Sequence, residues 1–220
     1  MKNMEKDMQN LINIEPLTNQ NIELADLLLS ELLKEIDVCS GIPIISIFTS
    51  IHKSINSIYE YKMYRRLLYF YQGCKEINSH EKEKFLKKIK EKEAETGYRM
   101  ILLLERLDVD EKAELIGKLY VYCVENQYDM LSYFRICRCV EKCFYEDLQY
   151  LEKWSEKDTI CAQNTDIPQE IIESLYNDGL LLECGIDGGG FKEDEETGVM
   201  YSLNLYGKII ANLLRKNINE

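Results

Sequence analysis

The chain has 220 residues, of which 45% are hydrophobic and 30% charged, and its formal net charge at pH 7 is −12. This length and apolar content suffice to bury a core, so the composition excludes a disordered chain, a collagen-like chain and a small disulfide scaffold. The negative charge argues against a protein that binds nucleic acid over its whole surface.

The first three quarters of the chain predict one helix after another, because apolar residues recur at intervals of three and four. Pro43 suits the first turn of a helix and Gly73 a helix end. We expect an irregular antiparallel bundle that forms a domain over residues 1–157. Six segments have the helical spacing: residues 21–36, 43–73, 79–89, 100–107 (with a strand as the alternative), 108–123 and 131–151.

The pattern changes near Lys157, after which most of the glycines gather. Pro168 starts a short helix that stops at Asp178-Gly179, and a last helix covers residues 205–215. Residues 180–184 and 199–203 predict two strands joined by a glycine-rich acidic loop. We therefore expect a mainly α fold with a small α+β subdomain over residues 158–220 that contains one β-hairpin.

The C-terminal pattern resembles the second half of a winged-helix module. The step Asp178-Gly179-Leu180-Leu181 leads from helix to strand, and Tyr201-x-Leu203-x-x-x-Gly207 leads into the closing helix. The resemblance implies that the helix after Pro168 is the recognition helix and the hairpin is the wing. It also implies a first helix within 136–154, whereas the polar stretch 159–166 replaces the family's short second helix. Residues 1–155 show no family resemblance.

The charges of this module have the wrong sign for DNA. Residues 161–220 hold 4 basic and 11 acidic residues, a net charge of −7, whereas the nets of residues 1–60, 61–100 and 101–160 are −5, +5 and −5. A winged helix that reads DNA presents Lys or Arg to the phosphates. We therefore expect contact with a protein, and a solvated appendage is the alternative. The candidate partner-binding residues are Glu170, Glu173, Asp187, Glu193, Asp194, Glu195 and Glu196.

The basic segment, residues 61–100, interleaves tyrosines with lysines and arginines. One interpretation is contact with an anionic membrane surface, with the apolar stripe of residues 42–58 on an interfacial helix, and another is stacking on single-stranded nucleic acid. The third interpretation is a core-facing stripe beside a solvated helix face of paired charges. The candidate contacts with an anionic surface are Lys62, Arg65, Arg66, Lys87, Lys88 and Lys90.

Neither a catalytic constellation nor a cofactor or metal site is identifiable in the sequence. On a helix, Cys137 lies roughly 200° around the axis from Cys139, so these residues and Cys143 fit buried thiols better than a zinc knuckle. The two histidines, His52 and His80, have no evident partner for acid–base chemistry.

Targeting signals are also missing from the pattern. The first ten residues are polar, without the apolar run of a signal peptide, and no stretch reaches the roughly 18–20 apolar residues of a membrane span. The eight cysteines are scattered, mostly in apolar helical segments, as reduced thiols are. We therefore expect a cytoplasmic location.

Together these patterns predict a non-enzymatic interaction or regulatory protein that needs no cofactor. Its acidic module docks onto an unidentified protein partner, and its helical body is a scaffold and a candidate homo-oligomer interface. Three alternatives stay open: a peripheral membrane protein or effector that uses residues 42–58 and 61–100, a DNA-binding regulator, and an enzyme without a local signature.

Overall fold

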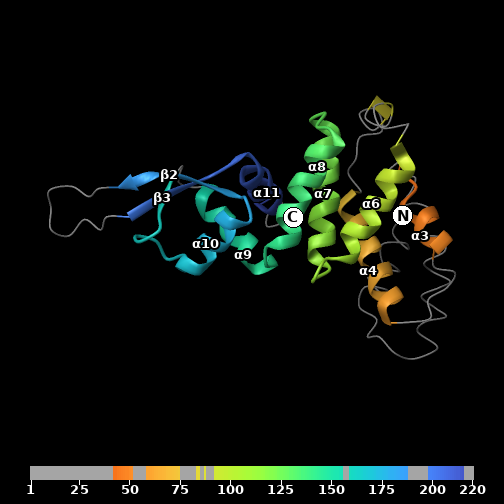
Figure 1. Ribbon diagram of the computed structural model, residues 1–220, viewed down its shortest axis with the longest axis horizontal. Helices are drawn as coiled ribbons and strands as arrows, with labels where there is room; N and C mark the ends of the chain where they lie inside the picture. Colours follow the sequence, from red (N-terminus) through yellow and green to blue (C-terminus); the bar gives the residue numbers. More distant parts are fainter. Residues whose placement is uncertain are drawn as a thin grey trace. The chain divides into compact units, whose positions relative to one another are not determined.

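The structure, a computed structural model, describes residues 42–51, 58–74, 83–84, 87, 92–155, 159–187 and 198–215 (Figure 1). Within them the chain is mainly helical with a small three-stranded antiparallel sheet near the C-terminus, which confirms the predicted fold class. Contacts divide the chain into two compact units, Met1–Tyr133 and Phe134–Glu220. The domain boundary expected after residue 157 stays a prediction, and the division by contacts falls earlier in the chain.

The N-terminal unit, up to Tyr133, is built from helices. α4 packs along α7, and α3 packs against α6 (Figure 1). The rings of Phe70, Tyr120 and Tyr133 follow one another in its core, with centroids 6.3 and 5.7 Å apart, and the Tyr133 hydroxyl donates to the Ile116 carbonyl at 3.3 Å. Its described helices are α3 (Ile44–Ile51), α4 (Ile58–Cys74), α6 (Glu93–Glu105), α7 (Glu111–Glu125) and the start of α8 (Met130–Lys142).

The described part of the apolar stripe belongs to this core. Ile42, Ile44 and Ile45 are buried, and Phe48 meets Tyr64 edge to face with ring centroids 5.1 Å apart. Ile51, at the end of α3, is 52% exposed. Residues 52–57, which hold the middle of the predicted stripe, lie outside the described residues. The core-facing interpretation therefore holds from Ile42 to Phe48, whereas Ile51 lies outside the core.

The C-terminal unit, from Phe134 on, surrounds a sheet of order β1-β3-β2, in which β3 pairs antiparallel with both neighbours (Figure 1). The predicted hairpin is thus present, and β1 adds a third strand within the polar stretch 159–166, for which no strand was predicted. Its elements after α8 are α9 (Tyr145–Gln149), the 3-10 helix η2 (Tyr150–Ser155), β1 (Ile160–Cys161), α10 (Gln169–Asn177), β2 (Leu181–Asp187), β3 (Gly198–Leu203) and α11 (Leu205–Arg215).

The helix predicted over residues 131–151 is interrupted. α8 ends at Lys142, and Phe144 has extended backbone angles, φ −65° and ψ 143°, before α9 begins. α9 and η2 then bury Leu148, Leu151 and Trp154, and the Trp154 indole donates to the Tyr201 carbonyl at 3.2 Å. The break turns one predicted helix into a corner that packs against β3 and α11.

The junction between β3 and α11 explains the motif that resembles a winged helix. The Asn204 amide donates to the Gly179 carbonyl at 2.6 Å, and its oxygen accepts the Gly207 N–H at 2.9 Å, so Asn204 caps α11. A Cβ on Gly207 would lie 2.3 Å from the Leu180 carbonyl oxygen. Gly207 therefore lets α11 approach the backbone that leads into β2.

Candidate protein-docking surface

The predicted partner-binding acids are described only in part. Glu170 and Glu173 are exposed on α10, and Asp187 ends β2. Glu193, Asp194, Glu195 and Glu196 lie outside the described residues, so their role stays a prediction.

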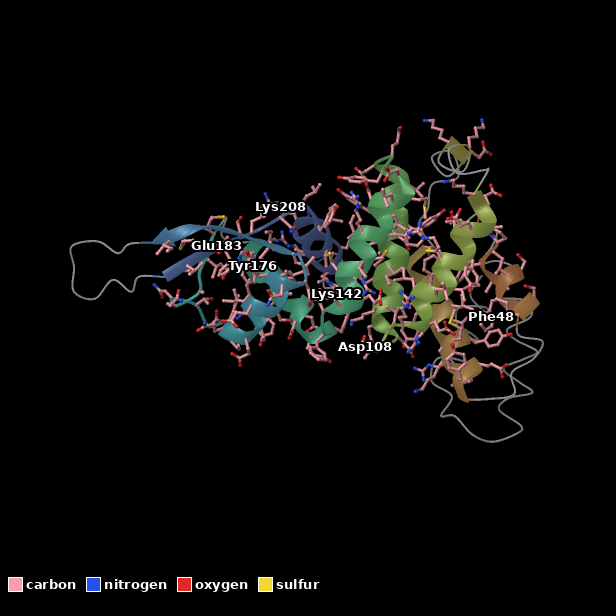
Figure 2. All side chains as sticks on the ribbon, in the orientation of Figure 1. Phe48, Asp108, Lys142, Tyr176, Glu183 and Lys208 are labelled. Atoms are coloured by element: carbon pink, nitrogen blue, oxygen red, sulfur yellow. The ribbon has the colours of Figure 1, made fainter. Side chains whose placement is uncertain are left out.

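Glu173 belongs to a cluster that three elements bring together. The register of β2 and β3 places Glu183 directly opposite Tyr201, so both side chains lie on the same face of the sheet. The ring of Tyr176, one helical turn after Glu173 on α10, meets the Tyr201 ring edge to face at 5.4 Å. Figure 2 labels Tyr176 and Glu183 where α10 lies beside the hairpin. We call Glu173, Tyr176, Glu183 and Tyr201 the tyrosine–glutamate surface.

The electrostatics of the surface are acidic. Burial raises the pKa of the Tyr201 hydroxyl, and the negative charges of Glu183 and Glu173 and the neighbouring Tyr176 raise it further. Both glutamates are exposed, and Tyr176 is 40% exposed. Aromatic rings together with nearby carboxylates attract a lysine or arginine side chain.

A β-bulge extends this surface along the hairpin. Glu183 pairs with Tyr201 and Ile186 pairs with Val199, with the irregularity lying between Glu183 and Gly185. Val199 and Tyr201 are two residues apart on β3 and share a face, so their partners Glu183 and Ile186 also share it. Ile186 is 73% exposed. The acidic surface therefore continues into an exposed apolar residue.

Sequence reasoning found Glu173 but missed Tyr176, Glu183 and Tyr201 as parts of one site. Each was visible in the sequence, and the acidic count of the module was the available signal. Their convergence depends on the register that places β2 beside β3 and on the packing of α10 against β2.

Two of the predicted anionic-surface contacts, Arg65 and Arg66, have partners within the N-terminal unit. The guanidinium of Arg65 pairs with Asp110 at 2.9 Å, and Arg66 Nη1 donates to the carbonyls of Leu104 and Glu105 at 3.2 and 3.0 Å. Arg66 thus holds the C-terminal end of α6, where carbonyls lack helical partners. Burial lowers the pKa of Arg66, and the charges of Asp110 and Asp108 oppose that shift.

The surroundings of these arginines are balanced in charge. A pocket of about 310 Å³ lies beside them, and its lining includes Lys62 together with Asp108, Asp110 and Glu111. Lys62 and Lys87 are exposed, whereas Lys88 and Lys90 lie outside the described residues. The described part of the basic segment therefore presents no unopposed positive patch at this pocket.

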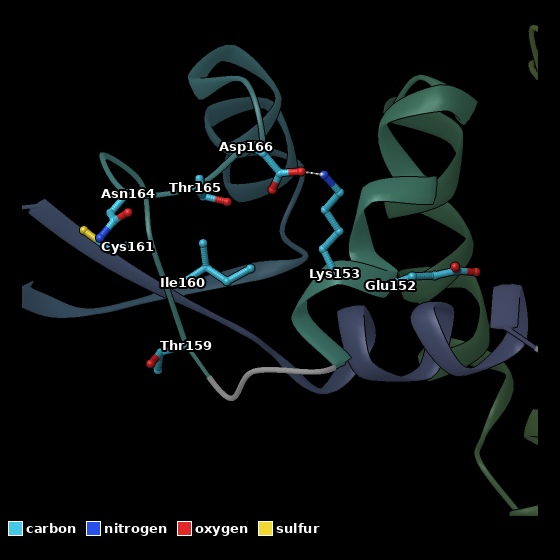
Figure 3. A pocket seen from close by; sticks show the side chains of 8 residues that line it. All are labelled: Glu152, Lys153, Thr159, Ile160, Cys161, Asn164, Thr165 and Asp166. Atoms are coloured by element: carbon cyan, nitrogen blue, oxygen red, sulfur yellow. Dashed lines mark hydrogen bonds and ion pairs between the residues drawn. The ribbon is translucent and has the colours of Figure 1, made fainter.

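A second pocket, of about 560 Å³, lies along β1 in the C-terminal unit (Figure 3). An ion pair between Lys153 and Asp166 spans it, and the Lys153 ammonium also lies 5.3 Å from the centre of the Tyr150 ring. Cys161 and Asn164 line the pocket, and its lining contains no histidine. The pocket offers hydrogen-bonding side chains from η2, β1 and the residues that follow β1.

The cysteines around α8 and the lengths of the helices bear on metal binding and on membrane insertion. Cys137 and Cys143 are buried, and burial raises the pKa of the half-buried Cys139 thiol. Within the part of the chain that the structure describes, no three His, Cys, Asp or Glu side chains are grouped to hold a metal ion. Of the helices described, none combines the length and apolar character needed to cross a membrane.

Comparisons of the chain with protein-family models, curated proteins and solved structures give no match. The described geometry contains an acidic and aromatic surface on the C-terminal unit, made by Glu173, Tyr176, Glu183 and Tyr201.

Proposed function

We propose that the protein is a non-enzymatic, cytoplasmic interaction or regulatory protein whose C-terminal unit docks onto a basic region of a partner protein. The observation that carries the proposal is the convergence of Glu173, Tyr176, Glu183 and Tyr201 from α10, β2 and β3. The exposed thiol of Cys184 and the buried cysteines fit a reducing compartment.

The topology supports a winged-helix-like module as the docking unit. A strand, a helix and a hairpin follow one another as β1, α10, β2 and β3, and the first strand pairs with the last. In the DNA-reading use of such a module, the helix before the hairpin brings basic residues to the phosphates. α10 instead carries Glu170 and Glu173 and has no Lys or Arg. The same framework therefore suits a positively charged partner.

The charge distribution supports the choice of a basic partner. Residues 161–220 have a net charge of −7, so they attract a positively charged surface and repel an anionic one. Each exposed ion pair contributes only about 0–1 kcal/mol, so charge by itself directs the encounter more than it holds the complex. The rings of Tyr176 and Tyr201 and the side chain of Ile186 add the apolar contact that a stable interface needs.

A pair of matched variants tests the proposal. E173Q/E183Q removes two negative charges from the surface, and E125Q/E146Q removes two from exposed positions elsewhere on α7 and α9. Proteins captured from a lysate by the wild type are identified by mass spectrometry, and the binding of the purified partner is then measured by calorimetry. We expect E173Q/E183Q to weaken binding and E125Q/E146Q to preserve it. Equal affinities for the two variants would overturn the proposal.

Among the described residues, no observation favours the membrane alternative or the DNA alternative. Ile44, Ile45 and Phe48 of the apolar stripe are buried, and Arg65 and Arg66 make intramolecular contacts. The homo-oligomer interface stays a prediction.

A further inference from the structure

β2 forms an edge of the three-stranded sheet within the described residues, since β3 occupies the centre and β1 the other edge. An edge strand has main-chain N–H and C=O groups that no neighbouring strand takes up. In β2 these groups are accessible, because Leu182, Glu183, Cys184, Gly185 and Ile186 are all exposed.

The hydrogen bonds of β3 show which groups of β2 point outward beyond the bulge. The Val199 carbonyl accepts the Ala162 N–H at 2.9 Å, and the Val199 N–H donates to Gln163 Oε1 at 2.9 Å. Both peptide groups of Val199 therefore face the β1 side. In an antiparallel ladder its partner Ile186 then forms the pair without hydrogen bonds, and the N–H and C=O of Ile186 point to the open edge.

The same alternation applies before the bulge. The Asn204 N–H donates to the Leu180 carbonyl at 3.1 Å, so this pair is hydrogen-bonded. Counting along the ladder, Leu182 pairs with Ser202 through hydrogen bonds, and Glu183 pairs with Tyr201 without them. The N–H and C=O of Glu183 thus also point outward. The one-residue bulge keeps Glu183 and Ile186 on one edge and one face although they are three residues apart.

We propose that β2 receives an extended, basic segment of the partner protein as an added strand. The segment pairs with the main chain of Glu183 and Ile186, and places a lysine or arginine beside Glu183 and an apolar residue beside Ile186. Main-chain hydrogen bonds hold the strand, and the cross-strand neighbours select its sequence. The inference rests on the proposed function and names the conformation and chemistry of the partner.

Charge complementarity identifies this occupant. Glu183 lies opposite Tyr201, the Tyr201 ring meets that of Tyr176, and the charges of Glu173 and Glu183 both act on the Tyr201 hydroxyl, on the face where the incoming basic side chain would lie. A cation there contacts carboxylates and aromatic faces together. An acidic strand would bring like charges to this edge. Pairing with a second copy of β2 is therefore disfavoured, since the copy would place its own Glu183 here.

The probe for this inference is a short peptide of alternating lysine and valine, with a peptide of alternating glutamate and valine as its counterpart. Its affinity for the full-length protein is measured by fluorescence anisotropy. We expect the lysine peptide to bind and the glutamate peptide not to bind. Glu183→Gln should weaken binding about two- to fivefold, as expected for a cross-strand charge pair.

Substitutions at Ile186 separate strand addition from contact through side chains. Ile186→Pro removes an N–H that points outward, so it blocks the added strand while the bonds to β3 stay intact. We expect Ile186→Pro to weaken peptide binding about tenfold or more. Ile186→Val keeps the N–H and should bind as the wild type does. Equal melting temperatures of the two variants show that the fold is unchanged.

Each outcome either supports or overturns the addition of a strand to β2. If Ile186→Pro binds the peptide as tightly as Ile186→Val, strand addition is wrong, and the proposed function stands where E173Q/E183Q still loses the partner. If the wild type does not bind the lysine peptide at millimolar concentration, strand addition is also wrong. If Ile186→Pro fails to fold, the lysine peptide N-methylated at alternate residues replaces it. Loss of binding then supports strand addition, and retention overturns it.

Discussion

Gly73 of α4 and Gly117 of α7 lie against each other where the two helices cross. A Cβ on Gly73 would lie 3.0 Å from the Gly117 Cα and 2.2 Å from the Glu114 carbonyl oxygen, and a Cβ on Gly117 would lie 2.3 Å from the Phe70 carbonyl oxygen. The two backbones therefore touch directly. Sequence reasoning took Gly73 as a helix end, whereas α4 continues to Cys74 and uses this glycine for packing.

Alanine at either glycine should destabilise the N-terminal unit. The added methyl group meets backbone atoms that no rotamer change can move, and overpacking of this kind costs about 1–3 kcal/mol. The gain in helix propensity, about 1 kcal/mol, offsets part of the cost. G97A is the matched control, because its Cβ would meet the flexible end of Ile47 at 2.7 Å. The midpoint of denaturant unfolding should be lower for G73A and G117A than for G97A. Equal midpoints would contradict the backbone contact.

Arg66 should not tolerate lysine. Its guanidinium donates to two carbonyls at the end of α6 and lies beside Asp110, and a lysine ammonium lacks the planar fork that serves several acceptors. We expect R66K to lower the free energy of unfolding by about 1–3 kcal/mol. K62Q changes an exposed charge on the same helix and should leave stability unchanged. An unchanged free energy of unfolding for R66K would instead indicate that only the positive charge of Arg66 matters.

Asn204 should show a graded response to substitution. N204A loses the cap on the Gly207 N–H and the donor to the Gly179 carbonyl, which together are worth about 1–3 kcal/mol. N204S keeps a capping oxygen and lacks the donor to the Gly179 carbonyl, so its unfolding free energy should lie between those of N204A and the wild type. Thermal unfolding measures the series. An N204S protein as unstable as N204A would show that the cap contributes nothing.

The thiol of Cys123 should link stability to alkaline pH. Burial, with a smaller contribution from the charge of Asp129, raises the pKa of Cys123 from its ordinary value of 9.0 to about 12. The unfolded thiol ionises above pH 9 while the folded thiol stays protonated, so this stabilising contribution is present below pH 9 and is lost as the pH rises towards 12.

The measurement compares the wild type with C123A. Unfolding free energies are followed between pH 8 and pH 11, and the wild type should lose stability more steeply. The half-buried tyrosines with raised pKa values, such as Tyr69, act equally in both proteins. Parallel curves for the two proteins would refute the role of Cys123. Alkylation of the native protein at pH 8 should modify the exposed Cys184 before the buried Cys123.

Much of the fold was predictable because its signals are local. The 3–4 spacing of apolar residues predicted α7 and α11, and Pro168 and Gly179 bounded α10. The break at Phe144 was not predicted, since the apolar spacing continues through it. β1 was also missed: two residues carry no strand pattern, and Ile160–Cys161 is a strand only because β3 lies beside it.

The candidate site was less predictable than the fold. Composition indicated an acidic C-terminal unit, and Glu170 and Glu173 were found from their place on α10. Tyr176, Glu183 and Tyr201 have no common pattern in the sequence, because they converge through pairing between strands and packing of a helix. The sequence marked Arg65 and Arg66 as part of a basic segment, but it did not show that Arg65 pairs with Asp110 and that Arg66 donates to the end of α6.

The sequence by itself determined the helical body, the hairpin near the C-terminus and the sign of its charge, because these follow from short-range periodicity, turn residues and counting. Tertiary structure decided which side chains act together. The bulge between Glu183 and Gly185 shifts the register by one residue and brings Ile186 to the face of Glu183. Asp110 forms ion pairs with Arg65 and Arg66, so both arginines make contacts within the protein. Both outcomes depend on pairs far apart in the chain, whose geometry exists only after the elements have packed.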